Sequence, residues 1–132
     1  MGISVVQKAG RVPVTVFYIQ GDIDSSTYQQ IQAQIEQVVQ AGAHDIVLDL
    51  SEVGYLSSAG IRMLSSLFYQ LRGNLPQESD AAMKQGIHDG TFKSPHVKLA
   101  SAPQRVVDVL KMSGLDMVIE MYRNVPEAVA SF

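Results

Sequence analysis

The chain of 132 residues contains no cysteine. This absence excludes disulfides, thiol catalysis and thiolate metal sites, and it fits a cytoplasmic protein. The chain also lacks an excess of basic residues: its formal net charge is −3, which argues against nucleic-acid binding because phosphates require a basic surface. No apolar run approaches the roughly 20 residues that cross a bilayer, and the N-terminus lacks the n- and h-regions of a signal peptide. We therefore expect a cytoplasmic protein with no membrane insertion.

What the chain does contain is the composition of one ordinary globular domain. Hydrophobic residues make up 46% of it and charged residues 17%, a balance typical of neither disordered nor membrane-spanning chains. A chain of this length can bury roughly two thirds of its unfolded surface. We therefore expect residues 1–132 to form a single domain.

The stretch 45–71 carries the strongest structural pattern. It opens with a nearly unbroken apolar run at 46–50, which indicates a strand covered on both faces, in the middle of a largely parallel sheet. A short turn follows, and a helical pattern starts at Ser57-Ser58-Ala59-Gly60. The apolar stripe of this helix has the spacing i, i+3, i+7 and i+10 and consists of Ile61, Leu64, Phe68 and Leu71.

Two serines therefore lie where this helix begins. The N-terminus of a helix has free backbone N–H groups and the positive end of the helix dipole, so it accommodates an anion well. One interpretation of Ser57 and Ser58 is that one of them is the N-cap, a common role for serine. The other interpretation is that one of them accepts a phosphoryl group.

The rest of the chain alternates between strand and helix patterns. The predicted elements are strands at 4–8 and 12–19, a helix with Tyr28, Ile31, Ile35 and Val38 on one face, a strand at 97–100, a helix starting at 101–104, a strand at 116–122 and a short helix at 126–132. We expect Asp24 to cap the first helix, Ala41-Gly42 to end it, and Ser101 to start the later one with capping-box spacing. Met63 and Met112 are expected to fill the core or a groove.

Residues 74–94 do not follow either pattern. They hold a proline, two glycines, mixed charges and scattered apolar residues. Connections longer than about 12–15 residues are usually functional or disordered. We therefore predict an insertion or flexible loop at 74–94.

Three segments together resemble the STAS domain, the fold of bacterial anti-sigma-factor antagonists. The first runs from Asp49-Leu50-Ser51 through Tyr55-Leu56-Ser57-Ser58-Ala59-Gly60-Ile61; the second is Gly21-Asp22-Ile23-Asp24; the third is Met112-Ser113-Gly114-Leu115-Asp116. The resemblance covers nearly the whole chain apart from 74–94. It implies an α/β fold, a single STAS-type domain with a mixed sheet of about five strands and four helices packed on it.

The resemblance also implies a function and a site. In the antagonists a partner kinase phosphorylates the serine two residues before the glycine, which corresponds to Ser58; Ser57, where many family members carry Asp, is the alternative. The implied partner-binding residues are Gly21, Asp22, Asp24, Ser57, Ser58, Ala59 and Gly60.

The implied protein is a regulatory binding protein and not an enzyme. Its expected partner is an anti-sigma factor with serine kinase activity, with a serine phosphatase as a further candidate, and its expected state is a monomer or weak dimer. The second hypothesis is a constitutive STAS adaptor in a larger signalling or transport assembly, where Ser58 would only be a cap.

Other chemistry fits the residues less well. A nucleophile elbow requires G-x-S-x-G, which the chain lacks around its serines, and a hydrolase would need His44, His88 or His96 beside Ser58. The histidines lack metal-site spacing, and no phosphate-binding glycine loop is present. The sequence thus predicts no bound cofactor or metal.

Overall fold

The computed structural model describes residues 2–43, 45–72, 96–117 and 119–132. The predicted insertion at 74–94 lies outside these residues. Within them the chain forms one five-stranded sheet in the order β1-β2-β3-β4-β5. The strands are β1 (Gly2–Ala9), β2 (Pro13–Gln20), β3 (Ile46–Glu52), β4 (Val97–Ala100) and β5 (Glu120–Tyr122).

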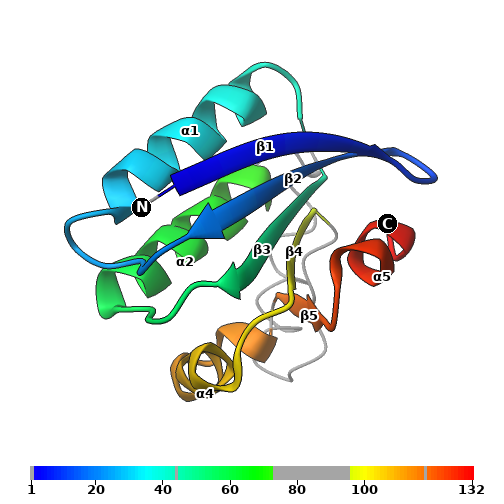
Figure 1. The fold of residues 1–132 in the computed structure, drawn as a ribbon. Helices are drawn as coiled ribbons and strands as arrows, with labels where there is room; N and C mark the ends of the chain where they lie inside the picture. The colour runs from blue at the N-terminus through cyan, green and yellow to red at the C-terminus, as the bar shows by residue number, and fades with distance from the viewer. Residues whose placement is uncertain (1, 44, 73–95, 118) are drawn as a thin grey trace.

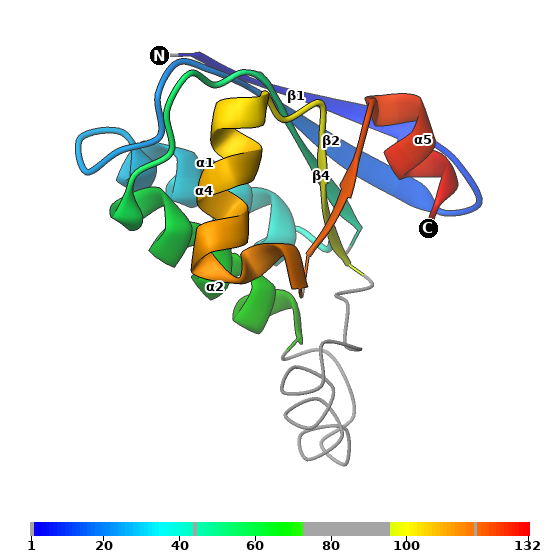
Figure 2. The same cartoon turned by 90° about the horizontal axis from the view of Figure 1, so that it is seen from below.

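The strand order equals the chain order, and this arrangement decides where the helices lie. β1 and β2 form an antiparallel hairpin, and every later neighbour pair is parallel. Crossovers between parallel strands are almost always right-handed. Because each crossover here moves in the same direction across the sheet, the connecting helices in the described ranges lie on one face: α1 (Tyr28–Gln40), α2 (Ser58–Arg72) and α4 (Gln104–Ser113) (Figures 1 and 2).

The last helix, α5 (Val125–Ala130), covers the other face (Figure 2). The molecule therefore has two apolar layers with β3 between them. Ile46, Leu48 and Leu50 face the larger layer, whereas Val47 packs with α5. This confirms the predicted central strand covered on both faces, and the α/β fold with a five-stranded mixed sheet and four α-helices in the described part of the chain is the one expected.

The apolar stripes of the predicted helices are also confirmed. Ile31 and Ile35 of α1 are buried, as are Leu64 and Phe68 of α2. The helix α1 ends at Gln40 with Ala41 as its C-cap, and the next residue, Gly42, has a φ of 115°, in the left-handed region that favours glycine. Of the two methionines expected to fill the core or a groove, Met63 is buried, but Met112 is 89% exposed on α4, so the prediction is wrong for Met112.

One predicted boundary near the C-terminus is wrong. Residues 116–122 were expected to form one strand, but Leu115–Met117 is a 3-10 turn and the strand begins at Glu120. Leu115 and Ile119 are both buried, and the N–H of Ile119 donates to the carbonyl of Leu115. A spacing of four residues suits one face of a strand as well as one face of a helix, but the i to i+4 backbone bond is that of a helical turn, so this part of the segment is not extended.

The predicted capping box of α4 is also wrong. The N-cap is Pro103, and no side chain caps the helix. Ser101 instead adopts a φ of 61°, and its hydroxyl donates to the carbonyl of Arg123 at 3.3 Å. The serine therefore joins the ends of β4 and β5 and is not available to the helix.

One buried lysine connects α5 to the sheet. Lys98 of β4 is 4% exposed, and its Nζ donates to the Ser131 hydroxyl at 2.8 Å and the Ser131 carbonyl at 3.2 Å. The ammonium also lies 3.8 Å from Glu120 and 4.5 Å from the centre of the Phe132 ring. Burial raises the pKa of the neighbouring Tyr122, whose hydroxyl donates to Glu120. The lysine thus holds the residues that follow α5 against the sheet.

Candidate functional site

Two connections meet at the carboxyl ends of β2 and β3. The Ile23 N–H donates to the Tyr55 carbonyl at 2.9 Å, and the Ser57 N–H donates to the Ile23 carbonyl at 2.9 Å. These bonds flank an isolated parallel bridge between Ile23 and Leu56. The predicted segments 21–24 and 57–60, far apart in the sequence, therefore lie beside each other.

A glycine allows this close approach. A Cβ added to Gly60 would lie 2.5 Å from the Leu56 Cδ1, 2.8 Å from the Ile23 Cγ2 and 3.2 Å from the Ile23 carbonyl oxygen. Leu56 and Ile23 are buried, so neither can move outward freely. Gly60 is therefore required because the first turn of α2 packs directly on the bridge.

We expect Gly60→Ala to destabilise the domain by about 1–3 kcal/mol, the usual cost of overpacking. Helix propensity alone would favour alanine by up to about 1 kcal/mol, so the sign of the change separates the two effects. The measurement is urea unfolding. The control is Ala33→Gly at an exposed position of α1, where helix propensity alone should make glycine the less stable residue. An unchanged or raised unfolding midpoint for Gly60→Ala would show that the bridge can yield.

The carboxylate of Asp24 orders the connection between β2 and α1. Asp24 Oδ1 accepts hydrogen bonds from the Ser26 hydroxyl at 2.6 Å and the Ser26 N–H at 2.9 Å, and these bonds lower the pKa of Asp24. The prediction that Asp24 caps the helix is wrong: the N-cap of α1 is Thr27, without a side-chain cap bond. Thr27 instead donates to the Asp22 carbonyl at 2.8 Å. Asp24 shapes the turn before the helix because its short side chain reaches the N–H two residues on.

The two serines at α2 have different environments. The Ser57 carbonyl accepts the first helical bond, from the Ile61 N–H, and the Ser57 hydroxyl accepts from the Gly60 N–H at 3.3 Å. Ser57 is therefore the N-cap. Ser58 is the first residue of the helix and is exposed. Ser58 therefore presents an exposed hydroxyl, whereas the hydroxyl of Ser57 is used to cap the helix.

These roles predict a difference between two alanine variants. Ser57→Ala removes a cap and should lower the free energy of unfolding by about 0.5–2 kcal/mol. Ser58→Ala removes an exposed hydroxyl at a helical position and should change it by less than about 0.5 kcal/mol. Thermal and urea unfolding of both variants measures this, and equal losses would contradict the assignment of Ser57 as the cap.

The predicted contact residues are not equally accessible. Asp22 and Ser58 are exposed, whereas Ala59 and Gly60 are buried beneath the surface that Ser58 presents. Exposed neighbours that the sequence reasoning missed are Tyr55, 51% exposed, and Arg62. Arg62 lies four residues after Ser58, so the two side chains are neighbours on the helix. The i, i+4 spacing could have identified Arg62; nothing in the sequence distinguished Tyr55 from a core residue.

The structure separates this site from the residues considered for other chemistry. His96 lies at the amino end of β4, where its Nδ1 is 3.2 Å from Asp45 Oδ1. Ser58 follows the carboxyl end of β3, about 20 Å away along a strand of this length. His44 and His88 lie outside the described residues. Within the described ranges, no three histidine, aspartate or glutamate side chains are grouped so that they could hold a metal ion.

Comparison with known proteins bears on the same elements. A profile of the STAS domain matches residues 5–74. A Bordetella bronchiseptica protein, BtrV, provisionally named an anti-sigma factor antagonist, is 37% identical over 54 residues, which are 41% of this chain and 47% of the relative. The match thus spans about half the length of that curated relative.

Solved structures are similar over most of the chain. An anti-sigma factor antagonist from Mycobacterium paratuberculosis has a TM-score of 0.69 at 19% identity, covering 98% of this chain and 93% of that one. An antagonist (STAS) domain protein from Planctomyces limnophilus has 0.68 at 21%, covering 96% and 93%. The Bacillus cell fate determinant SpoIIAA in its phosphorylated form has 0.62 at 16%, covering 97% and 96%. At these identities the likeness concerns the fold.

The strands follow one another in chain order, and α1, α2 and α4 lie on one face of the sheet. The start of α2, which bears the two serines, is joined to the connection between β2 and α1. These features define a class of small α/β domains. The profile match extends over more than half of the 132 residues and includes both connections of the site. The chain belongs to the STAS domain family. No helix among those described has the length and apolarity needed to cross a membrane.

Proposed function

We propose that this chain is an anti-sigma factor antagonist whose binding to an anti-sigma factor with serine kinase activity is switched off by phosphorylation of Ser58. The observation that carries this proposal is the exposed Ser58 hydroxyl beside a serine that already caps the helix. A kinase could modify Ser58 without breaking the bond that starts α2. The names of the relatives, which are antagonists of anti-sigma factors, support the same function.

The proposed contact surface consists of the exposed parts of the two joined connections. It includes Asp22, Tyr55 and Ser58, with Asp24 half-buried at its margin. An exposed tyrosine is a favourable interface residue because it offers a large rigid area together with a polar end. Gly60 supports this surface from below because it lets α2 pack on Ile23, and Ala59 is buried next to it in the chain.

A phosphoryl group at Ser58 would change the surface and leave the fold intact. It adds about −1.5 to −2 charges, placed on the first turn of a helix of 15 residues, where the dipole favours an anion. Arg62, one turn further along the helix, can pair with it. The partner would meet this charge and bulk within the contact, so binding would fail while the domain remained folded.

The transfer itself requires only a hydroxyl from this chain. The Ser58 oxygen would attack the γ-phosphorus of ATP held by the partner kinase with Mg²⁺, ADP would leave, and a base of the kinase would take the hydroxyl proton. A serine phosphatase would restore the hydroxyl by hydrolysis. Both enzymes act in the cytoplasm in this scheme, where ATP is available.

The test combines the purified chain with the candidate anti-sigma kinase from the same genome and Mg²⁺-ATP. We expect the mass to rise by one phosphate, which tandem mass spectrometry should locate on Ser58. Ser58→Ala should abolish the increase, whereas Ser57→Ala, the matched control, should retain it. Location on Ser57 would overturn the site. No modification combined with stable binding would favour the constitutive adaptor.

A further inference from the structure

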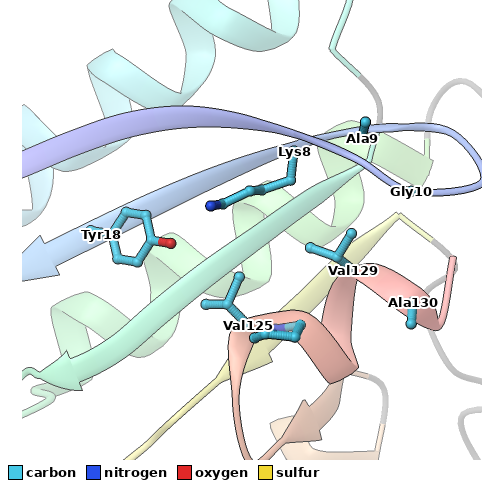
Figure 3. A pocket seen from close by; sticks show the side chains of 8 residues that line it. Lys8, Ala9, Gly10, Tyr18, Val125, Val129 and Ala130 are labelled. Carbon is cyan, nitrogen blue, oxygen red and sulfur yellow. The ribbon is translucent and has the colours of Figure 1, made fainter.

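A groove lies between the end of the β1–β2 hairpin and α5, on the sheet face opposite α1 and α2 (Figure 3). It is a cavity of about 470 Å³, within the range of about 300–1,000 Å³ that holds small molecules. Its sheet side includes Lys8, Gly10 and Tyr18, and its helix side includes Val125, Pro126 and Val129. Its two walls come from opposite ends of the chain.

The strand register explains why this groove has an apolar base. Lys8 lies opposite Val14, and Tyr18 is on the same face of β2 as Val14 and Val16. Val14 and Val16 are buried and pack with residues of α5 in the smaller apolar layer. A ligand in the groove would therefore contact aliphatic side chains below it and on the helix side.

One end of the groove is closed by a close approach of the hairpin to the helix. A Cβ added to Gly10 would lie 3.0 Å from the Val129 Cγ1 and 3.2 Å from the Val129 carbonyl oxygen. The glycine thus lets the hairpin backbone touch α5. The two walls approach each other closely there.

Two polar groups converge on the other part of the groove. Figure 3 shows the Lys8 side chain running along the sheet toward Tyr18, whose hydroxyl points into the same space. Neither the Lys8 ammonium nor the Tyr18 hydroxyl has a hydrogen-bond or ion-pair partner among the residues that the structure describes. The register neighbour of Tyr18 on β3, Asp49, is buried and accepts the Ser51 N–H at 2.8 Å. The residues that line the groove therefore supply a cation and a hydroxyl donor and include no carboxylate.

We propose that this groove binds a small amphiphilic anion, with its carboxylate at Lys8 and Tyr18 and its aliphatic chain against Val125, Pro126 and Val129. The charge complementarity selects a carboxylate, because a charge-assisted hydrogen bond from an ammonium is stronger than a neutral one. The apolar lining selects an alkyl chain. The groove lies on the sheet face opposite the helix that bears Ser58 (Figure 2), so this site is independent of the proposed antagonist function.

The test is a titration of the full chain with decanoate below its micelle-forming concentration, followed by amide NMR shifts and calorimetry, with decanol as the neutral probe. Decanoate should shift signals of 8–10, 18 and 125–130. Lys8→Met should weaken decanoate binding about tenfold, which equals about 1.4 kcal/mol, and should leave decanol binding unchanged. Tyr18→Phe should weaken decanoate less. Arg11→Met, the control at an exposed cation of the same turn, should bind decanoate as the parent does.

A further variant tests the apolar wall. Val129→Ala widens the groove and removes chain contacts, so it should weaken both probes, and its unfolding curve verifies that the domain stays folded. The proposal would be overturned by equal affinity of parent and Lys8→Met for decanoate, or by shifts that avoid the groove. It would also be overturned if groove signals moved with protein concentration alone, since a second copy of the chain would then be the occupant.

Discussion

Ser58→Asp is expected to weaken binding to the cognate anti-sigma factor by tenfold or more, with no loss of thermal stability. A carboxylate in the first helical turn is favourable by about 0.3–1 kcal/mol, so the melting temperature should hold or rise slightly. The same charge, desolvated inside the contact, costs a few kcal/mol unless the partner pairs it. Each 1.4 kcal/mol is a factor of ten in affinity, which calorimetry resolves.

The control for this variant is Ser66→Asp. Ser66 is an exposed serine on the same helix, eight residues and about 12 Å further along its axis. Ser66→Asp adds the same charge to α2 outside the two joined connections, so it should reduce the affinity for the anti-sigma factor much less than Ser58→Asp does. If Ser58→Asp bound as tightly as the parent while Ser58→Ala lost binding, the hydroxyl would be a structural contact, and the adaptor hypothesis would replace the switch.

Lys98→Ala is expected to destabilise the domain by about 2–4 kcal/mol, the range for truncating a long buried side chain. The substitution leaves a space between β4 and α5, and the Ser131 hydroxyl and carbonyl lose their donor. Urea unfolding should show the loss, and amide exchange should rise first in α5. The surface that bears Ser58 lies on another part of the sheet and should keep its partner affinity.

Lys98→Met separates packing from charge. Methionine keeps an unbranched apolar stem of similar volume, and volume-conserving replacements usually cost less than about 1.5 kcal/mol. Replacing a buried ionic group by an apolar one can even stabilise a domain. A loss as large as that of the alanine variant would show that the bonds of the ammonium, and not the packing of its stem, hold α5 in place.

The accuracy of the sequence predictions followed the kind of interaction in each segment. The apolar run 46–50 was recognisable as a central strand because all its side chains are buried, on two faces. The stripe of Leu64 and Phe68 was recognisable because a helix packs along one line. The predicted strand 116–122 began too early because the buried Leu115 and Ile119 are four residues apart, a spacing that one face of a strand and one face of a helical turn share. Ser101 misled because its hydroxyl bonds to a carbonyl 22 residues away, which no local rule anticipates.

By itself, the sequence determined most of the helices and strands, the pair of serines at a helix start and the STAS family, because each of these depends on patterns of residues close together in the chain. Only the tertiary structure decided that Ser57 caps α2 while Ser58 faces solvent, that Ala59 and Gly60 are buried, and that Lys98 is buried. It alone brought the β1–β2 hairpin against α5 to form the groove. The exposure of a side chain and its contacts with distant segments depend on the order of the strands and on the sheet face that each helix covers. A local sequence pattern specifies neither the strand order nor the face.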